Sequence, residues 1–119
     1  MLPSQIETSL RELNSLVLEG RILDAFDKFY HDNVVMQEND AAPTISKSAN
    51  RQRELQFVEN VIEFRGAEVK SVGISGDLSY VIWKYDYTHK EWGVRNYTQV
   101  SVQQWKDGKI INELFIYNN

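Results

Sequence analysis

Two acidic residues, Glu38 and Asp40, close the stretch FYHDNVVMQEND (residues 29–40) and are the first side chains in the sequence that could do chemistry. The apolar residues 34–36 just before them predict a short strand that leads into a core. A carboxylate at the end of such a strand is either solvated at a rim or directed into a pocket. In a pocket, loss of water raises its pKa and lets it exchange protons. These residues alone leave both interpretations open.

A second candidate acid, Glu113, lies near the C-terminal end. Asp107-Gly108 predicts a two-residue hairpin turn, and pairing outward from it sets which side chains share a face. On this face Glu113 either forms an ion pair with Arg95 or Lys109, or shares protons with Glu38 across a pocket. The predicted face carries Thr98, Val100, Val102, Gln104, Ile111, Glu113, Phe115 and Tyr117.

Three aromatic residues, Trp83, Tyr85 and Tyr87, alternate along another predicted strand and therefore share one face. They can line a ligand pocket, where the rings stack and the hydroxyls orient the ligand. They can equally be core residues of a curved sheet. The alternation supports both interpretations.

Metal and cofactor sites are not predicted. The chain has no cysteine and only two histidines, of which His31 reads as a solvated helix cap and His89 as part of an exposed hairpin loop. Two distant histidines do not form a metal ligand set. No glycine-rich phosphate loop is present, so no nucleotide cofactor is expected.

Length and composition predict one domain over residues 1–119. The net charge of −4 disfavours binding to nucleic acid, which needs a basic surface, and to anionic membranes. No apolar run is long enough to span a membrane. We therefore expect a cytoplasmic protein without nucleic-acid or membrane partners.

The periodicity of apolar residues changes from helical to strand-like along the chain, which predicts an α+β fold. Ser4 with Glu7 predicts a capping box for the first helix, and Gly20 predicts its end. Both faces of the sheet are partly apolar, as expected if helices cover one face and a partner subunit covers the other. Helices are predicted to end at residues 20, 30 and 64. A loop is predicted over 39–49, and strands are predicted over 34–36, 68–75, 78–89, 94–106 and 109–117.

Three segments carry a resemblance to a known family: EGRILDAFDKFYHDNVVMQEND (19–40), SGDLSYVIWKY (75–85) and VSVQQWKDGKIINELFIY (100–117). In this order they resemble the SnoaL-like families of the nuclear transport factor 2-like superfamily. The resemblance implies a cone-shaped, curved antiparallel sheet with three N-terminal helices enclosing an apolar pocket. It also implies a homodimer formed through the outer face of the sheet, where Trp92 and Trp105 are expected.

The resemblance places Glu38 at the position of the general base of the related ketosteroid isomerases. Leu13 and Val100 stand where those enzymes have their oxyanion-hole donors, so steroid isomerase activity is not expected. The predicted ligand is a small apolar or carbonyl-containing molecule. The protein is either a proton-transfer enzyme of the isomerase, cyclase or dehydratase type, using Glu38 and Glu113, or a non-catalytic binding or assembly module. The candidate ligand-binding residues are Trp83, Tyr85, Tyr87, Val100, Val102, Phe115 and Tyr117.

Overall fold

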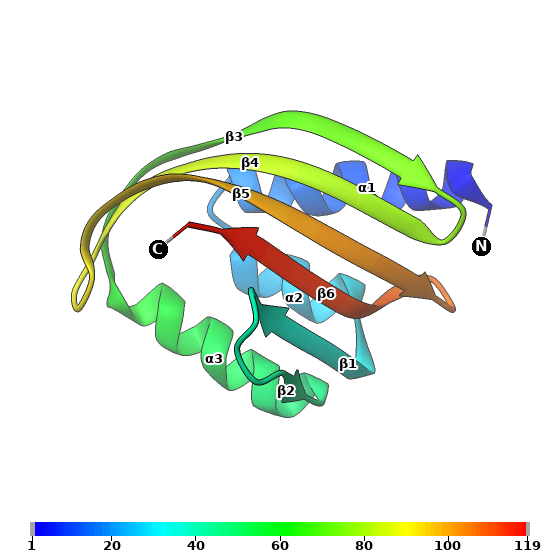
Figure 1. The fold of residues 1–119 in the computed structure, drawn as a ribbon, viewed down its shortest axis with the longest axis horizontal. Coiled ribbons are helices and arrows are strands. Elements are labelled where there is room, and N and C mark those ends of the chain that lie inside the picture. The colour runs from blue at the N-terminus through cyan, green and yellow to red at the C-terminus, as the bar shows by residue number, and fades with distance from the viewer. Residues whose placement is uncertain (1, 119) are drawn as a thin grey trace.

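The computed structural model describes residues 2–118. Within them, three helices lie against the concave side of one curved six-stranded sheet (Figure 1). The strand order is β2-β1-β6-β5-β4-β3. The elements are α1 (Pro3–Leu18), α2 (Ile22–Phe29), β1 (Tyr30–Glu38), β2 (Thr44–Ile45), α3 (Lys47–Asn60), β3 (Val61–Ser75), β4 (Leu78–His89), β5 (Gly93–Lys106) and β6 (Lys109–Tyr117).

The predicted α+β fold with three helices is confirmed, but the sheet is mixed rather than wholly antiparallel. Strand β1 runs parallel to β6, with Met36 opposite Glu113 and Glu38 opposite Phe115. All other strand pairs are antiparallel. The parallel pair joins the early part of the chain to its last strand, and so brings the two candidate acids into one region.

Helix α1 packs through one apolar stripe but begins differently from the prediction. Pro3 occupies the first turn, where its missing N–H is no loss. The backbone N–H of Leu2 donates to Gln5 Oε1 at 2.7 Å, so the predicted cap at Ser4 is wrong. Gly20, with φ of +79°, ends the turn after the helix as predicted. The buried apolar residues of α1 are Ile6, Leu10 and Leu13.

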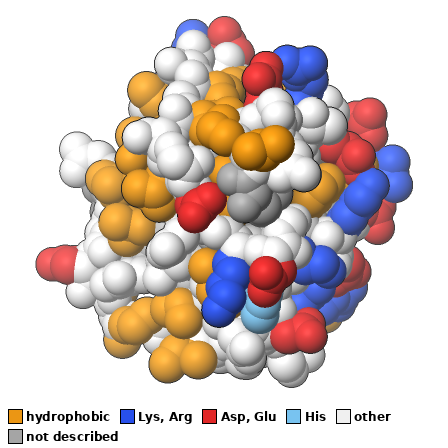
Figure 2. All heavy atoms as spheres, turned by 90° about the vertical axis from the view of Figure 1, so that its right-hand side faces the viewer, with side chains coloured by type: hydrophobic (Ala, Val, Ile, Leu, Met, Phe, Trp, Pro, Cys, Tyr) orange, Lys and Arg blue, Asp and Glu red, His pale blue; other side chains and the backbone are white. Residues whose placement is uncertain are grey.

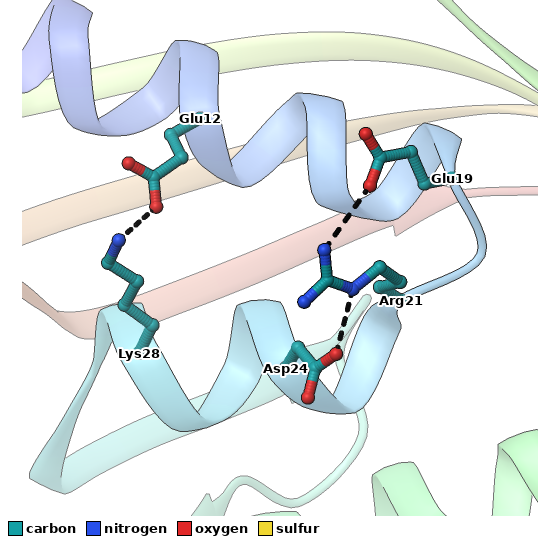
Figure 3. Close-up of polar contacts among 5 residues, drawn as sticks. All are labelled: Glu12, Glu19, Arg21, Asp24 and Lys28. Atoms are coloured by element: carbon teal, nitrogen blue, oxygen red, sulfur yellow. Dashed lines mark hydrogen bonds and ion pairs between the residues drawn. The ribbon is translucent and has the colours of Figure 1, made fainter.

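Helix α2 lies beside α1, and exposed ion pairs link the two (Figure 3). Lys28 pairs with Glu12 of α1, and Arg21 bridges Glu19 at 3.6 Å and Asp24 at 2.9 Å. Exposed pairs of this kind contribute only about 0–1 kcal/mol each. The packing of the helix therefore depends mainly on its buried residues, Ala25, Phe26 and Phe29.

Helix α3 starts three residues earlier and ends four residues earlier than predicted. Ser46 caps it, because its Oγ accepts the Ala49 N–H at 3.2 Å. The predicted helix over Val61–Phe64 is instead the start of β3, which pairs with β4 through Val61 and His89. The β-branched residues at this point favour strand over helix once a partner strand is available.

The hairpin of β5 and β6 begins as predicted, with Trp105 opposite Ile110, and then shifts register. Gln104 lies opposite Asn112, so Ile111 is an extra residue in β6, as in a β-bulge. One extra residue exchanges the two faces of a strand relative to its partner. The predicted pairing beyond the turn is therefore wrong, and Glu113 lies opposite Gln103 rather than Val102.

The outer face of the sheet is partly apolar. Val102 and Val100 lie on it, because they pair with Leu114 and with the exposed Ile116. Trp105 does not lie there as predicted: it is buried in the core on the inner face. Across β4, β5 and β6 the outer apolar rows are Tyr80, Val102 and Leu114, and Ile82, Val100 and Ile116.

The end of the molecule that carries the β3–β4 and β5–β6 turns has interspersed acidic and basic side chains (Figure 2). This end therefore offers no continuous surface of one charge. No helix among residues 2–118 is long and apolar enough to cross a membrane.

Candidate functional site

A cavity of about 240 Å³ lies between α3 and the inner face of the sheet. At its mouth it joins a second, outer hollow of about 510 Å³, which shares the side chains of Glu38, Phe57 and Trp92 with it. The cavity alone is smaller than the roughly 300–1,000 Å³ of pockets for drug-sized ligands, and the adjoining hollow adds to the space open to a small molecule. Its polar and aromatic lining includes Tyr30, Glu38, Asn50, Arg53, Glu54, Phe57, Trp83, Tyr85, Tyr87, Trp92, Tyr97, Gln99, Gln103, Glu113 and Phe115.

Glu113 is the most deeply buried acid of the cavity, with 2% of its surface exposed. Its carboxylate accepts hydrogen bonds from the Tyr30 hydroxyl and from Gln103 Nε2, the latter at 2.9 Å. Burial raises the pKa of Glu113 to about 7, although the two hydrogen bonds act to lower it. The alternative of an ion pair with Arg95 or Lys109 is wrong, because both carboxylate oxygens bind neutral donors.

A chain of buried hydrogen bonds fixes the orientation of the Gln103 side-chain amide, which donates to Glu113. Trp105 Nε1 donates to Ser79 Oγ at 2.9 Å, and Ser79 Oγ donates to Gln103 Oε1 at 2.6 Å. Because the Gln103 oxygen is occupied in this way, its NH₂ group must face Glu113. Each member of the chain is buried. The carboxylate is therefore held in a pre-oriented site rather than in a flexible one.

Glu54, on α3, is a second cavity acid, and the sequence interpretation did not include it. It is partly buried, and no hydrogen bond or ion pair to its carboxylate is found among residues 2–118. Burial and the nearby charges of Glu113 and Glu38 raise its pKa to about 7, against a lowering effect of Arg53. The signal in the sequence was the spacing of Asn50, Glu54 and Phe57, which places all three on one helical face.

Glu38 lies at the mouth of the cavity, at the end of β1. Its side chain is 45% exposed and forms an ion pair with Arg53 at 3.2 Å. It lines both the cavity and the outer hollow. Asp40 follows in an exposed turn. Glu38 is therefore a rim carboxylate with a cationic partner, in a setting unlike that of Glu113.

The predicted aromatic residues line the cavity. Trp83 and Tyr85 stack with ring centres 5.3 Å apart, and the hydroxyls of Tyr87 and Tyr97 are hydrogen-bonded at 2.9 Å. Phe115 lines the cavity and Tyr117 lines the outer hollow. Val100 and Val102 line neither, because the extra residue in β6 places Ser101 and Gln103 of β5, instead of the two valines, beside Glu113 and Phe115 on the inner face.

His89 is not in an exposed loop, as the sequence suggested. Only 4% of its surface is exposed, and its ring stacks on Trp92 with centres 3.7 Å apart. Trp92 in turn lies near Phe57, so these rings form one wall of the mouth. Within residues 2–118, no group of three or more histidine, cysteine or acidic side chains is arranged to hold a metal ion.

Comparison with known proteins agrees with this architecture. The family model described as the SnoaL-like domain matches residues 5–117. The chain belongs to the SnoaL-like family. A search of curated proteins finds no match.

Solved structures share the nuclear transport factor 2-like fold of this SnoaL-like chain. A Mesorhizobium loti protein with the provisional name SnoaL-like polyketide cyclase is 26% identical, with a TM-score of 0.82 over 92% of this chain and 97% of its own. A provisionally named isomerase from Bacillus subtilis is 17% identical, with a TM-score of 0.80 over 99% and 90%. A nuclear transport factor 2-like protein of unknown function from Burkholderia xenovorans is also 17% identical, with a TM-score of 0.77 over 98% and 84%.

Proposed function

We propose that this SnoaL-like protein binds a small apolar molecule with a carbonyl group and moves a proton on it. The observation that carries the proposal is Glu113, a buried carboxyl group with a pKa of about 7 inside an aromatic cavity. A group with this pKa both accepts and releases a proton near neutral pH. The provisional cyclase and isomerase names of similar structures are compatible with this chemistry.

Glu113 and Glu54 have complementary roles in this proposal. The negative charge of Glu113 raises the pKa of Glu54, so the two carboxyl groups hold one proton between them over part of the neutral range. The ionised Glu113 removes a proton from the carbon beside the carbonyl, and that C–H bond breaks. Protonated Glu54 donates its proton to the carbonyl oxygen, so an enol forms. If the ligand has a carbon–carbon double bond next to the carbon that loses the proton, this enol is a dienol. Glu113 then returns its proton to the far carbon of the dienol, the enol O–H proton goes back to Glu54, and the C=O bond re-forms, which completes an isomerisation.

Tyr30 and Gln103 support this step by holding Glu113 in place. Each carboxylate oxygen has two lone pairs, so a hydrogen bond from either donor leaves a lone pair for the substrate proton. Glu38, which the resemblance to ketosteroid isomerases places at the position of the general base, is the alternative partner acid. Because Glu38 is exposed and paired with Arg53, Glu54 is the better proton donor beside Glu113 in this proposal.

The test is exchange of the protons beside the carbonyl of 4-phenylbutan-2-one in D₂O, followed by proton NMR. We expect the protein to accelerate exchange, and Glu113→Gln to reduce the enhancement by about 100-fold or more, the range for loss of a general base. Glu59→Gln is the matched control, because Glu59 is an exposed residue of α3. Exchange by Glu113→Gln at the wild-type rate would contradict the proposal.

A second candidate function is ligand binding without catalysis. The ion pair between Glu38 and Arg53 favours it, because a base at that position is already neutralised by a partner. Binding of 4-phenylbutan-2-one without any acceleration of proton exchange would support this function over the enzymatic one.

We further propose that the outer face of the sheet pairs two copies of the chain. The apolar rows through Val102 and Val100 are the support, together with the 47% exposure of Ile116. We expect a dimer for the wild type and a monomer for Val100→Lys by sedimentation velocity. A monomeric wild type, or a dimeric Val100→Lys variant, would contradict this pairing.

A further inference from the structure

Arg95 is a cationic side chain at the mouth of the cavity and differs from the other arginines. It lies opposite Tyr87 on the inner face of the sheet and lines the outer hollow. Its guanidinium stacks over the ring of Tyr97, with 4.8 Å between the guanidinium carbon and the ring centre. The stacking fixes the direction of the side chain and leaves its in-plane N–H donors available.

The other five arginines each have a carboxylate partner. Arg21 is an example, with Asp24 and Glu19 (Figure 3). Among residues 2–118, no carboxylate lies within ion-pair distance of Arg95, and no hydrogen bond from its guanidinium is found. The paired arginines are Arg11, Arg21, Arg51, Arg53 and Arg65.

Glu38, the neighbouring acid at the mouth, is not a counter-ion for Arg95. Glu38 lines the same hollow, but its carboxylate is held by Arg53. The two arginines at the mouth thus differ: Arg53 has its anion within the chain, whereas Arg95 has none in the described part. A partly buried guanidinium with free donors is suited to an anion from outside the protein.

We propose that Arg95 binds the carboxylate of a small aromatic acid whose apolar body enters the cavity. This inference rests on the proposed small-molecule function and adds the charge of the ligand to it. A single planar guanidinium matches a carboxylate through two parallel hydrogen bonds. The aromatic wall of Phe57, Tyr87 and Trp92 between Arg95 and the cavity suits a ring attached to that carboxylate.

The alternative, a purely structural Arg95, makes a different prediction. Its contact with Tyr97 would then be its whole contribution, and neutral and anionic ligands of the same shape would bind equally. The distinction needs a pair of probes that differ only in charge. 3-Phenylpropanoate and 3-phenylpropanamide are such a pair, because the amide has nearly the same shape and no charge.

The experiment is calorimetric titration of the full chain with both probes at pH 7.5. We expect the acid to bind about 10-fold more tightly than the amide, corresponding to about 1.4 kcal/mol. In Arg95→Gln the acid should lose this advantage while the amide binds as before. Arg11→Gln is the matched control, since Arg11 is an exposed residue of α1 paired with Glu7 of the same helix, and it should keep the 10-fold preference.

Two results would overturn the inference while leaving the proposed function in place. One is equal affinity for the acid and the amide in the wild type. The other is an acid preference that persists in Arg95→Gln. Failure of both probes to bind would instead overturn the proposed small-molecule function together with this inference.

Discussion

The deep end of the cavity and its mouth both hold carboxylates, but in different environments. At the deep end, Glu113 is buried and bound only by the neutral donors of Tyr30 and Gln103. At the mouth, Glu38 is 45% exposed and paired with Arg53. Desolvation without a counter-ion favours the protonated form of Glu113. Glu38 is neither buried nor without a counter-ion. The surroundings of an acid, and not its presence in a strand, decide whether it can work as a proton carrier.

The largest expected difference between the two regions concerns stability against pH. The folded-state pKa values of Glu113 and Glu54 are raised from 4.5 to about 7. Between these pH values the folded protein holds protons that the unfolded chain has released, so stability falls as pH rises from about 4.5 to 7. The shift of Glu113 corresponds to roughly 3 kcal/mol.

Urea unfolding between pH 4.5 and 8 measures this effect. We expect the free energy of unfolding of Glu113→Gln to fall less steeply with pH than that of the wild type, because the contribution of Glu113 is gone. The control Glu59→Gln should keep the wild-type slope. A wild-type stability that rises through this window, or an unchanged slope in Glu113→Gln, would show that the buried acid is not protonated there.

The second prediction concerns the hydrogen bonds at the deep end. Gln103→Leu removes the donor to one oxygen of Glu113 and keeps the approximate size of the side chain. We expect a loss of about 1–3 kcal/mol at pH 7, because a buried acceptor is left without its partner. The loss should shrink at pH 5, where Glu113 is protonated. The variant also removes the acceptor of the Ser79 hydroxyl, and that part of the loss should be the same at both pH values. An equal total loss at pH 7 and pH 5 would therefore show that the hydrogen bond to Glu113 contributes nothing.

The smallest effect is expected at the mouth. Arg53→Gln breaks the ion pair with Glu38, in which both side chains are about half exposed. Such a pair contributes at most about 1 kcal/mol. We expect a change within that range in urea unfolding, and a smaller one at high salt. A loss as large as that of Gln103→Leu would remove the distinction between the two regions.

The sequence predicted the parts of this comparison that depend on local periodicity. The alternation of Trp83, Tyr85 and Tyr87 and the apolar stripe of α1 marked inner faces correctly. The extra residue at Ile111 was not predictable from alternation, because two adjacent isoleucines fit either face. This one residue reversed the expected positions of Val100 and Val102.

The sequence also did not predict which side chains contact the buried acids. Tyr30 reaches Glu113 only because β1 pairs in parallel with β6, a contact between residues 83 positions apart. Glu54 is not marked by apolar periodicity, because that pattern selects the apolar residues of α3, such as Leu55 and Val58, and not a carboxylate. In the structure the polar face of that helix is turned to the cavity, which is typical of a binding site rather than a core.

The most direct test of the account is a carboxyl ¹³C NMR titration of the glutamates, assigned with Glu113→Gln, Glu54→Gln and Glu38→Gln. Glu113 and Glu54 should titrate near pH 7, well above the value of about 4.3 for glutamate in model peptides. In Glu113→Gln, the pKa of Glu54 should fall, because a neighbouring negative charge is gone. Titration of Glu113 near pH 4.3 would contradict the central claim that this cavity holds a desolvated, proton-exchanging acid.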